Sequence, residues 1–144
     1  MSAYDQPITD LSESESWKLL AGVELGRLIT SVGGQPEVFP VNFVTQDQTI
    51  LFRTAEGTKL SSVVVNQDVV FEADDHNMTE GWSVIIKGRA QVLDTRAEIE
   101  EAEQAQLLPW IPTLKLNYVR VTPREISGRR FRFGPEPDRE STFA

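Results

Sequence analysis

A glycine, a hydroxyl side chain and a lysine follow one another at Gly57-Thr58-Lys59, shortly after a strand-like run that ends at Arg53-Thr54. These residue types can hold a phosphate, because glycine lets the backbone approach closely, the hydroxyl donates a hydrogen bond and the lysine carries positive charge. If Leu60 to Val65 is helical, the free N–H groups at the helix start would add donors for the same anion. The alternative is a solvated loop whose lysine points into water.

Few other side chains in the sequence could take part in catalysis or bind a metal ion or ligand. The sequence has no cysteine and one histidine, His76, which excludes disulfides, thiolate sites, a cysteine nucleophile and multi-histidine metal sites. No acid or nucleophile is paired with His76, so we expect it to be a loop histidine and nominate no catalytic side chain. A cluster of arginines near the C-terminus is either a solvated strand and turn or includes cations that face an anionic cofactor tail or substrate. Its members are Arg120, Arg124, Arg129, Arg130 and Arg132.

The composition is typical of a globular protein with one core. The chain has 144 residues, of which 40% are hydrophobic and 25% charged, and its net charge is −8. The negative charge argues against nucleic acid as a partner, because binding to phosphate backbones depends on lysine and arginine. No apolar run approaches the roughly 20 residues needed to span a bilayer, and residues 1–10 do not have the pattern of a secretory signal. We therefore expect no membrane span and a cytoplasmic location.

The elements that must position the phosphate-binding residues begin with a helix. Ser12-Glu13-Ser14-Glu15 has the form of a capping box, in which the serine and glutamate side chains satisfy free backbone donors of a helix start. Leu25 to Val32 is predicted to be a strand with Leu28 and Thr30 on one face. After a turn at residues 33–36, further strands are predicted at residues 37–45 and 49–54.

The second half of the chain has the same alternation of strands and short helices. Thr95 and Glu98 repeat the capping-box form, and Gly88 marks a bulge or bend in a long strand. Pro123 is expected to separate the last two strands. The predicted elements are a helix at 60–66, a strand at 68–73, a loop at 74–80, a strand at 81–93, a helix at 95–107, and strands at 116–122 and 125–133.

Six segments in this order resemble the pyridoxamine 5′-phosphate oxidase-like family of flavin-binding split barrels. They are Gly26-Arg27-Leu28, Pro40-Val41-Asn42-Phe43, Leu51-Phe52-Arg53-Thr54, Gly57-Thr58-Lys59-Leu60, the run from Val69 to Asp74, and the run from Gly81 to Gly88. The chain is most similar to the shorter branch with nitroimidazole-resistance-type proteins and flavin- or deazaflavin-dependent reductases. The resemblance implies a mainly β fold with flanking helices, a six-stranded antiparallel split β-barrel at residues 11–133. Residues 1–10 and 134–144 are expected to be a loose arm and a flexible tail.

The resemblance also nominates cofactor-binding residues. Pro40, Val41 and Asn42 are expected beside the isoalloxazine ring, where a proline suits a strand edge that meets something other than a neighbouring strand. Arg53, Thr54 and Lys59 are expected to hold the ribityl phosphate, with Thr58 and Leu60 in the same turn. Thr58 stands where the vitamin B6 oxidases have a further basic residue, so this phosphate site has one cation fewer. The remaining nominated residues are Trp82, Ser83, Trp110 and Arg130.

By the same resemblance, two barrels pair as a homodimer with the flavin at their interface. The implied function is an oxidoreductase in which FMN passes hydride to a small organic substrate, since the chain has no evident catalyst of its own. One alternative is a reductase that uses the deazaflavin F420, and another is a flavin- or haem-binding carrier without turnover. Pyridoxamine phosphate oxidase activity itself is not expected, because the Arg-x-His substrate motif is missing around Arg129–Arg132.

Overall fold

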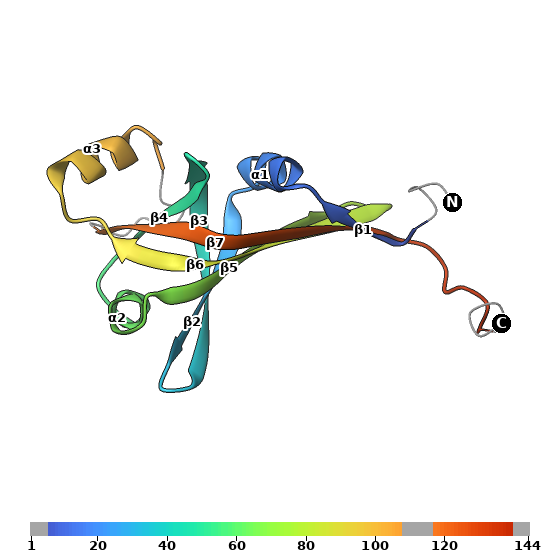
Figure 1. The fold of residues 1–144 in the computed structure, drawn as a ribbon, viewed down its shortest axis with the longest axis horizontal. Coiled ribbons are helices and arrows are strands. Elements are labelled where there is room, and N and C mark those ends of the chain that lie inside the picture. Colours follow the sequence, from blue (N-terminus) through green and yellow to red (C-terminus); the bar gives the residue numbers. More distant parts are fainter. Residues whose placement is uncertain (1–5, 108–116, 140–144) are drawn as a thin grey trace.

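A computed structural model describes residues 6–107 and 117–139, which form an antiparallel sheet with three helices beside it (Figure 1). The two capping boxes predicted from the sequence are both present, at Ser12 with Glu15 and at Thr95 with Glu98. The elements are β1 (Ile8–Leu11), α1 (Glu13–Ala21), β2 (Leu25–Val32), β3 (Gln35–Gln46), β4 (Thr49–Thr54), α2 (Thr58–Val65), β5 (Asp68–His76), β6 (Glu80–Val92), α3 (Arg96–Glu103) and β7 (Asn117–Arg132).

Six of the described strands close on themselves into a barrel. The ring runs β2, β3, β4, β7, β6, β5 and back to β2, and every pairing in it is antiparallel. The predicted antiparallel split barrel with flanking helices is therefore confirmed. Strand β1 lies outside the ring and pairs with β7, from Ile8 opposite Phe131 to Leu11 opposite Gly128. The prediction that residues 1–10 form a loose arm is wrong for residues 8–10, which this ladder holds in place.

The barrel interior is the main hydrophobic core, because alternate residues of each strand point inward. Leu28 and Thr30 are buried on the inner side of β2, as their spacing predicted. Phe43 of β3 and Phe71 of β5 meet edge to face, with ring centroids 4.8 Å apart. A second, smaller cluster lies under α3, where Ala102 packs near Leu51 and Leu93. Among the described residues, no helix is long and apolar enough to cross a membrane.

Strand β7 is continuous through Pro123, which corrects the prediction of two separate strands. The β6–β7 ladder shifts register between Lys87 and Gly88, at the predicted bulge, and Gly88 lies opposite Pro123. A Cβ at Gly88 would stand 2.4 Å from the carbonyl oxygen of Thr122, so this crossing has room only for glycine. The irregularity allows a proline inside the strand, because a bulge does not need its N–H for the ladder.

The predicted loop at residues 74–80 is shorter in the structure. Strand β5 continues to His76 and β6 begins at Glu80, so only residues 77–79 connect them. The Asn77 side-chain oxygen accepts hydrogen bonds from the N–H groups of Thr79 (2.8 Å) and Glu80 (2.9 Å), which closes a tight turn. His76 is consequently the last residue of a strand and not a loop residue as predicted.

Candidate functional site

The site nominated by the sequence lies where β3 and β4 separate. Strand β3 pairs with β2 from Gln35 to Asn42, whereas its pairing with β4 begins only at Phe43. Beyond Phe52, β4 continues in register with β7. The stretch of β3 that ends at Val41 therefore borders no described strand on its second edge. Pro40 suits this edge because it has no N–H to leave unsatisfied there.

The start of α2 lies beside this open edge. The Lys59 ammonium is 6.0 Å from the centroid of the Phe39 ring, so the lysine side chain reaches the stretch of β3 that has the open edge. The N-cap of α2 is Gly57, which makes no side-chain cap, whereas α1 and α3 both begin with a complete capping box. The first turn of α2, Thr58 to Leu60, therefore begins without a side-chain cap from its N-cap residue. Such a helix start, with a lysine in it, is suited to an anion.

Arg53 and Thr54 lie at the end of β4, on the other side of the split. The Arg53 guanidinium is 5.3 Å from the centroid of the Tyr118 ring and donates a hydrogen bond to the Leu107 carbonyl at 3.5 Å. Thr54 is buried, and its hydroxyl donates to the Ala55 carbonyl at 3.0 Å. Within one chain, therefore, the Lys59 side chain lies near Phe39 of β3, whereas the Arg53 side chain lies near Tyr118 of β7 and Leu107, which follows α3.

Trp82, Ser83 and Arg130 form a second group, on β6 and β7. Trp82 is opposite Arg130 in the β6–β7 ladder, and Arg130 Nη1 makes an ion pair with Glu80 Oε1 at 3.2 Å. In the barrel ring, β4 lies between β3 and β7, and β2 and β5 lie between β3 and β6, so neither strand of this group is next to β3. The nominated residues thus fall into two groups within one chain. Trp110 lies outside the described residues.

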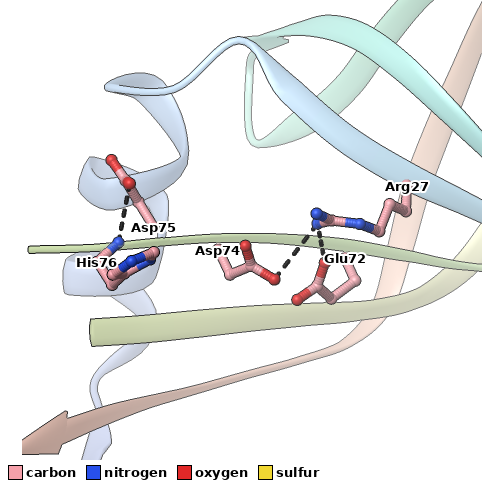
Figure 2. A network of polar contacts seen from close by, with 5 residues as sticks. All are labelled: Arg27, Glu72, Asp74, Asp75 and His76. Atoms are coloured by element: carbon pink, nitrogen blue, oxygen red, sulfur yellow. Dashed lines mark hydrogen bonds and ion pairs between the residues drawn. The ribbon is translucent and has the colours of Figure 1, made fainter. Parts of the chain in front are cut away.

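A polar cluster that the sequence analysis did not nominate lies on the outside of the barrel, between β2 and β5 (Figure 2). Arg27 Nη1 contacts Glu72 Oε1 at 2.8 Å and Asp74 Oδ2 at 3.3 Å. Arg27 is opposite Glu72 on β5 and opposite Pro40 on β3, so the cluster is one strand away from the open edge. The alternation of β2 already put Arg27 on the outer face, but nothing local in the sequence indicates that β2 pairs with β5.

The environment of Glu72 changes its acidity. Its side chain is four-fifths covered, and burial disfavours the charged form. Burial, followed by the hydrogen bond and negative charge of Asp74, raises the pKa of Glu72 from about 4.5 to about 7, and the Arg27 charge opposes this rise. Near neutral pH, the cluster therefore exists in two protonation states that differ by one charge.

A cavity of about 550 Å³ adjoins this cluster, between the α1–β2 connection and the end of β5. Arg27 and Asp74 belong to both the cluster and the cavity wall. The other lining residues are Ala21, Gly22, Val23, Glu24, Leu25, Asp75 and His76. The backbone N–H of His76 donates to Asp75 Oδ1 at 2.8 Å (Figure 2). The His76 ring meets the Phe133 ring edge to face. Within the described ranges, no three His, Asp or Glu side chains are grouped to hold a metal ion.

Comparison with known proteins finds a family model and relatives that match most of this chain. A sequence model of the family described as pyridoxamine 5′-phosphate oxidase matches residues 12–130. The uncharacterized protein Rv3129 of Mycobacterium tuberculosis is 66% identical over 101 residues, which are 70% of this chain and 92% of that protein.

Solved structures of related bacterial proteins have the same fold. A FAD binding protein from Mycobacterium smegmatis is 51% identical, with a TM-score of 0.77 over 87% of this chain and 99% of its own. A candidate pyridoxamine 5′-phosphate oxidase from Corynebacterium glutamicum is 44% identical, with a TM-score of 0.84 over 92% of this chain and 98% of its own.

Proposed function

The chain belongs to the pyridoxamine 5′-phosphate oxidase family, and on that premise we propose that it binds a flavin at the split between β3 and β4. We propose further that the flavin, as FMN, passes hydride to a small organic substrate. The observation that carries the proposal is the uncapped start of α2, which holds Lys59 beside the open edge of β3. FMN has a phosphate and a flat polar ring joined by a ribityl chain, and we assign the phosphate to the helix start and the ring to the open strand edge.

The residues at the split have distinct roles in this proposal. The N–H groups of the first α2 turn and the Thr58 hydroxyl donate hydrogen bonds to the phosphate, and Lys59 offsets its charge. The open edge of β3 at Pro40 and Val41 presents backbone groups to the polar rim of the ring. Arg53 is the cation on the β4 side of the split, next to Tyr118. A bound flavin would supply the two-electron chemistry for which this chain has no side chain of its own.

Pairing of two copies explains why the nominated residues are in two groups. In the same chain, Arg130 on β7 is two strands away from β3, and Trp82 and Ser83 on β6 are three strands away. Trp82 packs against the core of its own barrel, whereas a second barrel packed on the outside of this one could bring its own Ser83 to the split. We therefore propose a homodimer in which each flavin site is completed by the partner copy. The exposed apolar side chains Leu25, Val38 and Ile85 on the outer sides of β2, β3 and β6 support such a contact.

FAD is the second candidate for the flavin. The relative from Mycobacterium smegmatis, 51% identical, is described as a FAD binding protein. FAD has the same ring and ribityl phosphate as FMN, so the α2 start and the β3 edge suit both. The adenylate part of FAD, or the longer acidic tail of F420, would need further cations, for which the arginines of β7 are candidates.

Fluorescence-quench titrations of the purified protein with FMN, FAD and F420 test the proposal. Tight binding of FMN or FAD, followed by anaerobic reduction of the bound ring by NADH or NADPH, is expected for the oxidoreductase. Binding without reduction by any nicotinamide or deazaflavin donor would favour a flavin carrier. Preference for F420 would place the chain with the deazaflavin reductases, and failure of all three to bind would refute the proposed site.

A further inference from the structure

The outward side chains of β3, β2, β5 and β6 form one continuous surface, here called the outer face. Its apolar members are Leu25, Ile29, Val38, Pro40, Val70 and Ile85. The side chain of Val38 is 59% exposed, that of Leu25 41% and that of Ile85 38%. Ladder partners join these residues across four strands, with Ile29 opposite both Val38 and Val70. Large exposed apolar surfaces of this kind are typical of contact sites between proteins.

The cluster of Arg27, Glu72 and Asp74 lies in the middle of the outer face. Pro40 flanks Arg27 on β3, and Ile85 flanks Glu72 on β6. With both carboxylates ionised, the cluster has two negative charges and one positive charge, which leaves a net charge of −1. With one proton added at Glu72, it is neutral and retains its contact with Arg27.

We propose that a second copy of this chain docks on the outer face, and that each copy takes up a proton at the Arg27–Glu72–Asp74 cluster when it does so. This proposal rests on the homodimer of the proposed function and adds that pH regulates the formation of that homodimer. A two-fold contact sets each surface against the same surface of the other copy. With the two-fold axis near the middle of the outer face, a net charge of −1 would face another net charge of −1, and less water would surround both than in the separate copies.

The direction of the pH dependence follows from this geometry. Docking removes water from Glu72 and brings a like charge closer, and both effects favour its neutral form. Burial within one chain already raises the pKa of Glu72 to about 7. In the dimer the pKa would be higher still, so the dimer binds more protons than two separate copies. Pairing is consequently strengthened as the pH falls through 7 and weakened as it rises.

Other charged groups surround the cluster and must be distinguished from it. Lys87 on β6 is two positions beyond Ile85 on the same face, and its ammonium is 3.5 Å from Glu125 of β7. Glu24, Asp75 and His76 line the adjoining cavity. Histidine is the side chain that ordinarily changes charge near neutral pH, so a His76 variant is a required control.

Sedimentation velocity of the full chain at pH 6 and pH 8, with and without added FMN, tests the inference. The dimer dissociation constant is expected to rise by about tenfold or more from pH 6 to pH 8, since up to two protons are released per dimer. Glu72→Gln should pair tightly at both pH values, because an amide has the shape of the protonated carboxyl group without its titration. Glu100→Gln, in an exposed α3 ion pair, and His76→Gln should both retain the wild-type pH dependence.

Three outcomes would overturn the inference. They are a wild-type dissociation constant that is the same at both pH values, a pH dependence that persists in Glu72→Gln, and a chain that stays monomeric throughout. Failure of this inference can be distinguished from failure of the proposed flavin site. A chain that pairs with the expected pH dependence but binds no flavin would refute the flavin site and leave the proton link intact. A chain that binds flavin as a monomer would refute the pairing of copies and the proton link, and would leave the flavin site within one chain intact.

Discussion

Lys59 is the residue on which the proposed phosphate site depends most directly. Its ammonium lies next to Phe39, at an uncapped helix start, where a phosphate would gain a charge-assisted contact. Lys59→Ala is expected to weaken flavin binding by about 1–3 kcal/mol, which isothermal titration calorimetry can measure. Lys18→Ala, an exposed lysine of α1, is the matched control and should bind flavin as the wild type does. Unchanged affinity in Lys59→Ala would remove Lys59 from the site.

Glu72 should also make the stability of the fold depend on pH. Its pKa is raised from about 4.5 to about 7 in the folded chain, so the folded state binds more protons than the unfolded state between these values. The free energy of unfolding therefore falls as the pH rises through this window. Glu72→Gln has no proton to lose and is expected to be more stable than the wild type at pH 8, by on the order of 1 kcal/mol.

Urea unfolding at pH 4 and pH 8, at one protein concentration, checks this expectation. At pH 4 the wild-type carboxyl group is mostly protonated in both states, so the two proteins should differ little. Glu100→Gln, in an exposed ion pair of α3, should leave the wild-type pH dependence unchanged. An equal effect of Glu72→Gln at both pH values would show that packing, and not titration, is responsible.

At the scale of elements, the crossing of β6 and β7 depends on Gly88. A Cβ there would stand 2.4 Å from the Thr122 carbonyl oxygen and 3.1 Å from the Pro123 Cα, both of them backbone atoms that cannot rotate away. Gly88→Ala is expected to lower the free energy of unfolding by about 1–3 kcal/mol, since the two strands must move apart. Gly22→Ala is the control, because its Cβ would meet its nearest atom at 3.5 Å. Similar stabilities of the two variants in urea would contradict this account of the bulge.

At the scale of the whole molecule, the outer face should decide whether two copies pair. Val38 is 59% exposed in the middle of the apolar part of β3, where an aspartate would be buried without a partner on pairing. Val38→Asp is expected to be monomeric with the circular dichroism of the wild type. Met78→Asp, in the β5–β6 turn and 96% exposed, should remain dimeric. A dimeric Val38→Asp protein in sedimentation velocity would place the contact elsewhere.

The sequence was sufficient for features that short segments determine. Both capping boxes were predicted from four residues each, because a cap satisfies donors within its own turn. The bounds of β2 and the inward side of Leu28 and Thr30 follow from alternation alone. The order of six short segments was enough to indicate the barrel. In the candidate site, the Lys59 ammonium lies 6.0 Å from the centroid of the Phe39 ring, and the roles nominated for Lys59 and Pro40 stay predictions.

The tertiary structure determined the features that depend on pairing between strands distant in the chain. Only closure of the barrel brings Arg27 to Glu72, 45 residues away, and produces a carboxyl group with a pKa of about 7. The same closure keeps β7 continuous through Pro123, because the register shift at Gly88 accommodates the proline, and it holds residues 8–11 as β1. It also turns Arg53 towards Tyr118. Pairing partners and register arise from packing over the whole core, which no local pattern of residues contains.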